Sequence, residues 1–192
     1  MPKPSFFASL LWALMLWASV CMGPGARAEV SEFAMPSEKG MVFHRWPLLP
    51  RVPGWAQDRE LSVLNSINAL APNGSSFAKA ETVIYAKAVL KPNVPETQVP
   101  SLEQWVDKDK QDFISHVPGV KVAAAPALYT ADGKKCISYT YSPQSEGQWE
   151  RVSYLEEGDF FLVFTLSSRS QSGLQAATKA YEGMLRMYKE KP

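Results

Sequence analysis

Four strand-like segments follow one another between residues 120 and 168, and they constrain the fold more than any other feature of the chain. They read VKVAAAPALY, CISYTYS, WERVSYLEE and FFLVFTLSS, and the connections between them are TADGKK, PQSEGQ and Gly158-Asp159. Connections this short join antiparallel neighbours. The last segment is apolar at successive positions, which is typical of a strand in the middle of a covered sheet. We therefore expect an antiparallel sheet with residues 160–168 near its centre.

Two amphipathic segments can supply helices that cover such a sheet. The first, residues 102–117, follows a capping box of Ser101 and Gln104 and ends at Pro118-Gly119. Its apolar stripe consists of Leu102, Trp105, Val106, Phe113 and Val117. The second follows Ser172 and Gln175, which repeat the capping-box pattern. Its stripe consists of Leu174, Ala177, Tyr181, Met184, Leu185 and Tyr188.

The first half of the chain is patterned less clearly. Residues 40–46 (GMVFHRW) and 81–91 (ETVIYAKAVLK) are rich in aromatic and β-branched residues and predict two strands. Residues 57–71 are ambiguous between helix and strand, and we favour a polar turn or short helix followed by a strand near residues 67–71. Residues 29–39 show no pattern and are expected to form a flexible N-terminal arm.

Taken together, the order is three strands, a helix, four strands and a helix. It predicts one α+β domain over residues 40–190, with a central antiparallel sheet of about six to seven strands covered by two main helices.

The N-terminus has the pattern of a secretory signal peptide. Lys3 precedes the apolar run of residues 6–20, and Ala26-Arg27-Ala28 matches a signal peptidase site, so we expect residues 1–28 to be removed after Ala28. The apolar run is too short for an integral membrane span. This predicts a periplasmic or secreted protein. A lipoprotein anchored through Cys21 is the competing interpretation, although Val20 stands where that signal has a small residue.

Charge and cysteine content exclude several classes of protein. The chain has 20 basic and 19 acidic residues, and a nearly neutral, mixed surface gives no reason to expect nucleic acid as a partner. Cys136 is the single cysteine beyond the signal peptide, so no intramolecular disulfide is expected. In its alternating segment, Cys136 is interpreted as a small, partly buried hydrophobe and not as a nucleophile.

The residue types that catalyse reactions or bind metals are few and scattered. His44 and His116 are the chain's two histidines, and no serine lies in a G-x-S-x-G context. His116 is expected to lie in the last turn of the first helix, and the charges of residues 107–112 (DKDKQD) on its solvent-facing side. Glu156, Glu157 and Asp159 predict a solvated acidic turn and not a calcium loop. We therefore predict no catalytic residue, no cofactor and no metal site.

Several sequence segments and their order resemble those of proteins with the Mog1/PsbP-like fold, and in particular its small exported bacterial members of the DcrB and PsbP-like type. They are PNGSSFAKAETVIYAKAV, SLEQWVDKDKQDF, DGKKCISYTYS and YLEEGDFFLVFTLSSRSQ, which leads into the last helix. The resemblance implies an α/β/α sandwich and a compact accessory or binding protein without shared catalytic residues. No metal or subunit contact of the family can be matched to a residue of this chain.

Two functions remain open. The first is a non-enzymatic envelope accessory protein that binds another envelope protein or a small ligand. Its partner surface is predicted at His44, Trp46 and Trp55, within the segment FHRWPLLPRVPGW. The alternative is a periplasmic hydrolase whose site assembles only in three dimensions, indicated by a pocket that joins His44 to a carboxylate and to a serine or Cys136. The oligomeric state stays open.

Overall fold

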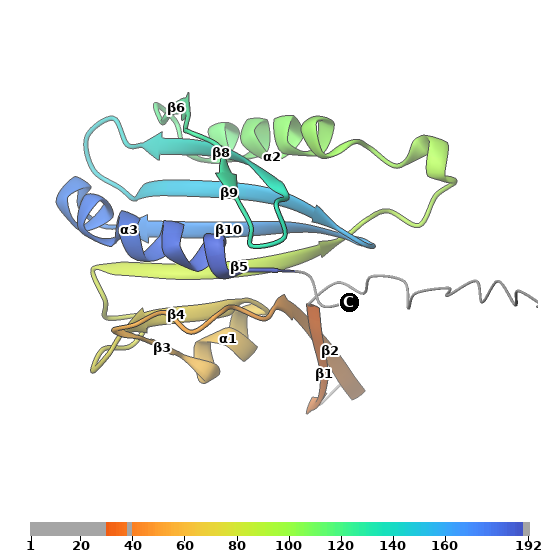
Figure 1. Ribbon diagram of the computed structural model, residues 1–192, viewed down its shortest axis with the longest axis horizontal. Helices are drawn as coiled ribbons and strands as arrows, with labels where there is room; N and C mark the ends of the chain where they lie inside the picture. The colour runs from red at the N-terminus through yellow and green to blue at the C-terminus, as the bar shows by residue number, and fades with distance from the viewer. Residues whose placement is uncertain (1–29, 38–39, 190–192) are drawn as a thin grey trace, which may run out of the picture.

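An eight-stranded antiparallel sheet forms the centre of the molecule in the computed structural model (Figure 1), which describes residues 30–37 and 40–189. The predicted signal peptide, with Cys21, lies outside these residues. The strand order is β3-β4-β5-β10-β9-β8-β6, and the short β7 also pairs with β8. The strands are β3 (Trp55–Gln57), β4 (Asn68–Pro72), β5 (Thr82–Leu90), β6 (Lys121–Ala124), β7 (Leu128–Tyr129), β8 (Lys135–Ser142), β9 (Trp149–Glu157) and β10 (Phe160–Ser168).

Strand β10 occupies the centre of the sheet, which confirms the expectation for residues 160–168. It pairs with β5 on one side and with β9 on the other, and all its residues after Phe160 are buried. The β9–β10 connection turns at Gly158, whose φ of 51° lies in the left-handed region that glycine adopts readily.

The prediction of six to seven strands in the sheet is wrong for two reasons. Residues 120–129 form two strands instead of one, because Pro126 has no N–H to donate and the ladder is interrupted there. In addition, Trp55–Gln57 forms the edge strand β3, for which no strand was predicted.

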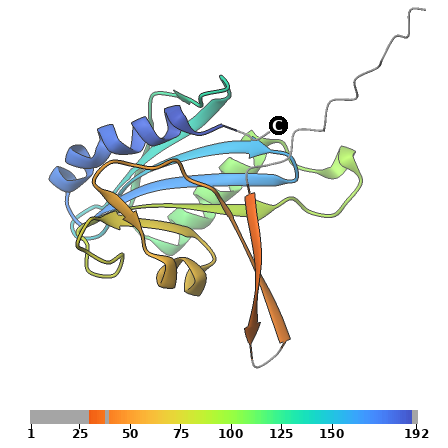
Figure 2. The same ribbon diagram turned by 60° about the horizontal axis from the view of Figure 1, so that its bottom comes forward.

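A separate two-stranded sheet corrects the prediction of a flexible arm at residues 29–39. Residues Val30–Ser37 form β1, which pairs with β2 (Gly40–Pro47) from Val30↔Pro47 to Ser37↔Gly40. Strand β2 confirms the first predicted strand but lies outside the main sheet. The backbone N–H and C=O groups of β2 need hydrogen-bond partners, and β1 supplies these partners. The hairpin projects from the body of the molecule (Figures 1 and 2).

Three α-helices and one short 3-10 helix complete the described part of the chain: α1 (Arg59–Asn65), η1 (Glu96–Gln98), α2 (Leu102–His116) and α3 (Gln171–Met187). The ambiguous segment 57–71 is therefore a short helix followed by β4. Ser101 and Gln104 form the predicted capping box of α2. The predicted box at Ser172 is wrong, because the Ser170 side chain caps α3 by accepting a hydrogen bond from the backbone N–H of Gly173. No helix within the described ranges is long and apolar enough to cross a bilayer.

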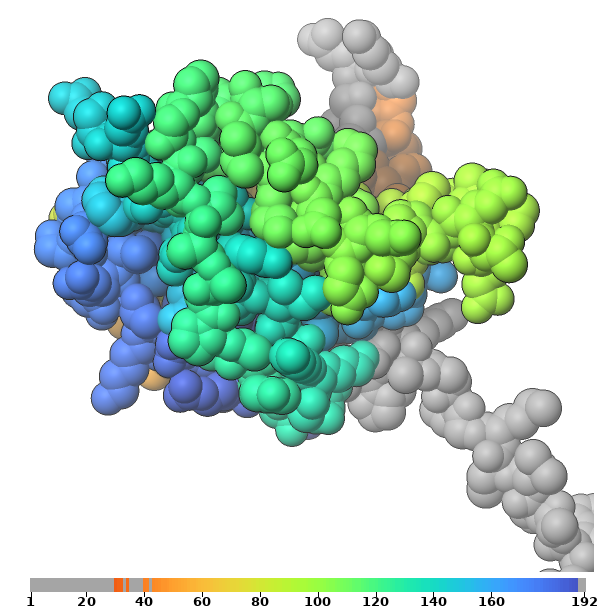
Figure 3. All heavy atoms as spheres, turned by 90° about the horizontal axis from the view of Figure 1, so that it is seen from above, coloured from red at the N-terminus to blue at the C-terminus, as the bar shows by residue number. Residues whose placement is uncertain are grey.

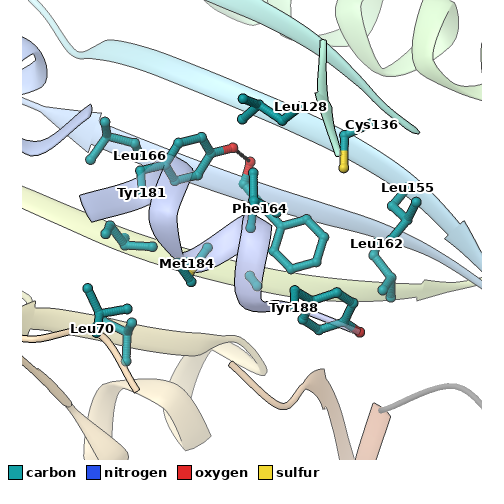
Figure 4. Close-up of a cluster of buried hydrophobic side chains, with 14 of the residues drawn as sticks. Leu70, Leu128, Cys136, Leu155, Leu162, Phe164, Leu166, Tyr181, Met184 and Tyr188 are labelled. Carbon is teal, nitrogen blue, oxygen red and sulfur yellow. Dashed lines mark hydrogen bonds between the residues drawn. The ribbon is translucent and has the colours of Figure 1, made fainter. Parts of the chain in front are cut away.

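The helices lie on opposite faces of the sheet (Figure 2). Helix α3 covers one face, where Tyr181, Met184 and Leu185 are fully buried (Figure 4). The Tyr181 hydroxyl donates to the Phe164 carbonyl oxygen at 2.9 Å, which satisfies the one polar atom that this ring brings into the core.

Helix α2 covers part of the opposite face. Its Trp105 ring stacks on Phe161 with centroids 4.8 Å apart, and Phe113 meets Tyr141 edge-on, also at 4.8 Å. In the space-filling view of Figure 3, the segment between β5 and α2 projects beyond the body of the molecule, while α2 packs onto it. Helix α2 lies mainly over β9 and the neighbouring β8. Part of the sheet face formed by β5 and β10 therefore stays uncovered by α2 and can form the floor of a cleft.

Candidate ligand-binding cleft

Two adjoining cavities, of about 260 and 500 Å³, open on the α2 side of the sheet and share Tyr85; together they are called the cleft below. Strands β5, β9 and β10 form the floor. Helix α2 forms one wall, and α1 with Phe77 forms the other. The smaller of the two, of about 260 Å³, is called the inner cavity. It is lined by Tyr85, Lys87, Asp109, Asp112, Phe113, His116, Tyr141, Glu150, Val152, Tyr154, Val163 and Thr165.

Strand alternation produces this floor. Successive side chains of a strand point to opposite faces, so residues in register at every second position share one face. Thr165 of β10 is paired with Tyr85 of β5 and with Val152 of β9, and Val163 is likewise paired with Lys87 and Tyr154. The floor therefore combines phenols, a lysine and a threonine, whereas the other face of the same strands is mainly apolar.

Glu150 is the most unusual residue of the floor. Its side chain lines the inner cavity although the residue is only 8% exposed. Among the described residues, no basic group lies within the 4.0 Å of an ion pair with it. Burial raises the pKa of its carboxyl, while the Ser167 hydroxyl and the charge of Lys87 act in the opposite direction. A buried acid that faces a cavity and has no ion-pair partner within 4.0 Å is available to a ligand.

A chain of hydrogen bonds leads from the floor to the helix wall. The Tyr154 hydroxyl donates to Asp109 Oδ2 at 2.9 Å, so its oxygen accepts the hydrogen of Tyr141 at 3.1 Å. The Lys87 ammonium lies 4.0 Å from Asp109 Oδ1. Burial is the main cause that raises the pKa of Tyr154 and of Tyr141, so both phenols stay protonated at neutral pH. These contacts therefore hold the Asp109 side chain in place at the mouth of the inner cavity.

The end of α2 forms the rim of the inner cavity. His116 lies in the last turn of the helix, as predicted, and its Nδ1 is 2.6 Å from the Asp112 carbonyl oxygen. The Asp112 carboxylate is paired with Lys108 at 2.5 Å. Lys108 pairs with Asp112 at i,i+4 and Lys110 with Asp107 at i,i+3. Asp109 departs from the prediction that residues 107–112 face solvent, because its side chain turns toward Tyr154.

The predicted partner residues lie outside the cleft. His44 and Trp46 are buried and Trp55 is half-buried, so these three rings offer little surface. Among the hairpin side chains that the structure describes, Met41 and Phe43 are each 56% exposed. Binding of a partner at His44, Trp46 and Trp55 stays a prediction.

His44 does contact a serine, which bears on the hydrolase alternative. Its Nδ1 lies 2.8 Å from the hydroxyl oxygen of Ser66, the residue that ends α1 in the left-handed conformation. Neither side chain lines the cleft. Cys136 is fully buried on the α3 face, and burial, with a smaller contribution from the charge of Asp132, raises the pKa of its thiol to about 12. It is therefore a core residue with no tendency to form a thiolate.

The acidic turn after β9 is only partly as expected. Glu156 and Asp159 are exposed, but Glu157 is 1% exposed and accepts a hydrogen bond from the Tyr188 hydroxyl at 2.9 Å. Throughout the described ranges, no three histidine, cysteine or acidic side chains gather closely enough to hold a metal ion.

A further cavity of about 860 Å³ lies beside the segment between β5 and α2. Its one lysine is already paired, because the Lys91 ammonium contacts Glu156 Oε1 at 2.5 Å and the Gly158 carbonyl oxygen at 2.7 Å. Its other charged residues, Glu96 and Asp159, are exposed. The cleft is therefore the stronger candidate site, since its buried carboxylate lacks such a partner.

Sequence reasoning missed Glu150, Asp109 and the tyrosines of the cleft. The alternation of WERVSYLEE does place Glu150, Val152 and Tyr154 on one face, and that signal could have been used. It does not tell which face a helix leaves uncovered.

Comparison with known proteins assigns no function to this site. No protein-family model matches the chain, and no curated protein sequence matches it. One similar solved structure is that of a protein of unknown function, suggested to be a regulator, from Pseudomonas aeruginosa. The similarity covers 84% of this chain and 98% of that chain, with 12% sequence identity and a TM-score of 0.48. Values this low carry no argument about ligand or activity.

Proposed function

We propose that the chain is an exported, non-enzymatic accessory protein that binds a small ligand in the cleft. The observation that carries this proposal is the buried carboxylate of Glu150, which faces an open cavity among three tyrosines. Concave sites with an apolar lining and a few convergent polar groups are typical of small-molecule binding. A buried carboxylate without a close ion-pair partner is costly, and a bound ligand would offset that cost.

Export is part of this proposal and rests on the signal peptide pattern of residues 1–28. Mass spectrometry of the mature N-terminus tests it. A free N-terminal Glu29 is the expected result; a lipid-modified Cys21 would replace the periplasmic form with an anchored one.

The resemblance to the Mog1/PsbP-like sandwich is also kept as a proposal. An antiparallel sheet with α3 on one face and α2 on the other supports it. The resemblance adds the expectation of an accessory role, which agrees with a sequence in which no serine lies in a G-x-S-x-G context.

A screen of ligands by thermal unfolding tests the proposed binding. Anionic, neutral and cationic small molecules are added to the protein and to a Thr165→Phe variant. The phenyl ring of this variant is larger than the threonine side chain and should project from the floor into the cleft. We expect compounds of one charge class to raise the Tm of the wild-type protein only. The proposal fails if no compound raises the Tm, or if the variant responds equally while circular dichroism shows it folded.

The contact between His44 and Ser66 favours hydrolysis as a second candidate function. A histidine within hydrogen-bonding distance of a serine hydroxyl can act as its general base. Turnover of a generic ester or peptide substrate that both His44→Ala and Ser66→Ala abolish would establish the hydrolase and displace the accessory role. Cys136→Ser is the control, and we expect it to leave any turnover unchanged.

A further inference from the structure

The charges around the inner cavity are unbalanced in favour of acids. Its lining includes three carboxylates, on Asp109, Asp112 and Glu150, whereas Lys87 is the one lysine or arginine among the lining residues. Lys108, which lies outside the lining, neutralises Asp112 at 2.5 Å. Lys87 lies nearest to Asp109, at 4.0 Å. Glu150 is therefore the acid that a ligand would have to satisfy.

The geometry favours an organic cation over a metal ion. Metal ions require several donors that converge on one point, and the described residues provide no group of three suitable side chains. Glu150 projects from the floor of the cavity, whereas Asp109 projects from the helix wall. Carboxylates on two sides of a cavity can accept hydrogen bonds from separate N–H groups of one extended molecule.

Aromatic side chains complete a surface suited to a cation. Tyr85, Tyr141, Tyr154 and Phe113 line the same cavity. The faces of such rings attract ammonium and guanidinium groups, and the attraction strengthens where water is displaced. An anionic ligand would instead meet two carboxylates, and it would have Lys87 alone to attract it.

We propose that the inner cavity binds a small organic cation, a primary amine or a guanidinium compound, whose charged group contacts Glu150. This inference rests on the proposed ligand-binding function and names the chemical class of the ligand. Asp109, held in place by Tyr154, accepts a second N–H group, and the tyrosine rings enclose the carbon chain between them.

Isothermal titration calorimetry tests the inference with four probes of similar length. Two are cations, 1,4-diaminobutane and agmatine; 1,4-butanediol is neutral and succinate is anionic. Each is titrated into the wild-type protein and into the variants Glu150→Gln and Glu156→Gln. The second variant is a matched control, because Glu156 lies on the same strand and face but lines a different cavity, where it pairs with Lys91.

We expect at least one cation to bind with a stoichiometry of one, and the neutral and anionic probes not to bind. Glu150→Gln should weaken binding by about tenfold or more, because a charge-assisted hydrogen bond is replaced by a neutral one. Glu156→Gln should leave the affinity unchanged.

Three results would overturn the inference. They are equal binding of 1,4-butanediol or succinate, unchanged binding to Glu150→Gln, and no binding of either cation at millimolar concentration. If neutral or anionic compounds still raise the Tm of the wild-type protein alone in the thermal screen, the ligand-binding function stands and only the cation is wrong. If nothing binds in either experiment, both proposals fail.

Discussion

The two faces of the central sheet are built from the same strands but differ in chemistry. In β10, Leu162, Phe164 and Leu166 point toward α3 and are completely buried in an apolar core. The alternate residues Val163, Thr165 and Ser167 point toward the cleft. The α3 face of the strand is therefore apolar at these positions, whereas the cleft face combines Val163 with the polar residues Thr165 and Ser167.

Two glutamates of β9 show the same contrast. Glu157 lies on the α3 face, where the Tyr188 hydroxyl donates to it at 2.9 Å. Glu150 lies on the cleft face without an ion-pair partner within 4.0 Å among the described residues. One buried acid is thus built into the core by the last residues of the fold, while the other is directed into a cavity. We take the difference to separate a structural acid from a binding acid.

The contrast predicts its largest effect for substitutions at neighbouring positions of β10. Phe164→Ala should lower the free energy of unfolding by about 3–5 kcal/mol, because it leaves a cavity beneath α3. Thr165→Ala, one residue away on the cleft face, should cost about 1 kcal/mol or less. Urea denaturation measures both values. Similar losses for the two variants would mean that the cleft face contributes to the core as much as the α3 face.

A smaller effect is expected from removing single phenol hydroxyls. Tyr188→Phe should cost about 1–3 kcal/mol, because it takes a donor from the buried Glu157. Tyr141→Phe should cost about 1 kcal/mol or less, since Tyr154 still donates to Asp109. Urea denaturation measures both losses. A larger loss for Tyr141→Phe than for Tyr188→Phe would contradict this prediction.

Glu150→Gln should leave the stability unchanged or raise it at neutral pH. The pKa of Glu150 in the folded state is raised by burial, so the folded protein binds more protons than the unfolded chain between the ordinary glutamate pKa and the raised value. Wild-type stability therefore falls as the pH rises through that window, and the variant should lack this decrease. The charged or titratable groups that line the same cavity as Glu150 are Lys87, Asp109, Asp112, His116, Tyr85, Tyr141 and Tyr154.

Unfolding measured at a series of pH values, for Glu150→Gln and for Glu156→Gln as control, checks this prediction. A clear loss of stability in Glu150→Gln at neutral pH would show that the carboxylate is needed by the fold itself, which contradicts its assignment as a binding group.

The smallest effect is expected on the outer surface of α2. Lys108 and Asp112 form an exposed pair at i,i+4, and Lys108→Ala should lower the free energy of unfolding only slightly, and less at high salt. Urea denaturation at low and high ionic strength checks the value. A much larger, salt-independent loss would indicate that Asp112 is held in place for the cleft and is not simply a solvated residue.

The elements predicted well are those determined by local sequence. Ser101 and Gln104 mark the start of α2 because their reciprocal hydrogen bonds involve only the first turn. The continuous apolar pattern of FFLVFTLSS identifies the central strand for a similar reason, since burial on both faces requires apolar residues at successive positions.

The elements predicted poorly depend on partners far away in the sequence or on small local differences. Strand β1 forms because β2 is there to pair with it, and Val30–Ser37 alone carries no strand pattern. Glu150 becomes a site residue because α2 lies beyond it and leaves the floor open. The start of α3 at Ser170 was missed for a simpler reason, since two serines compete for the cap within three positions.

We propose that the cleft face, and not the α3 face or the projecting hairpin, binds the ligand. Two-dimensional NMR of the isotopically labelled protein tests it directly, by titration with the compound that raises the Tm most. We predict that amide shifts change at Glu150, at Thr165 and along α2 near Asp109, while those of α3 stay constant. Changes confined to α3 or to the β1–β2 hairpin would contradict the account.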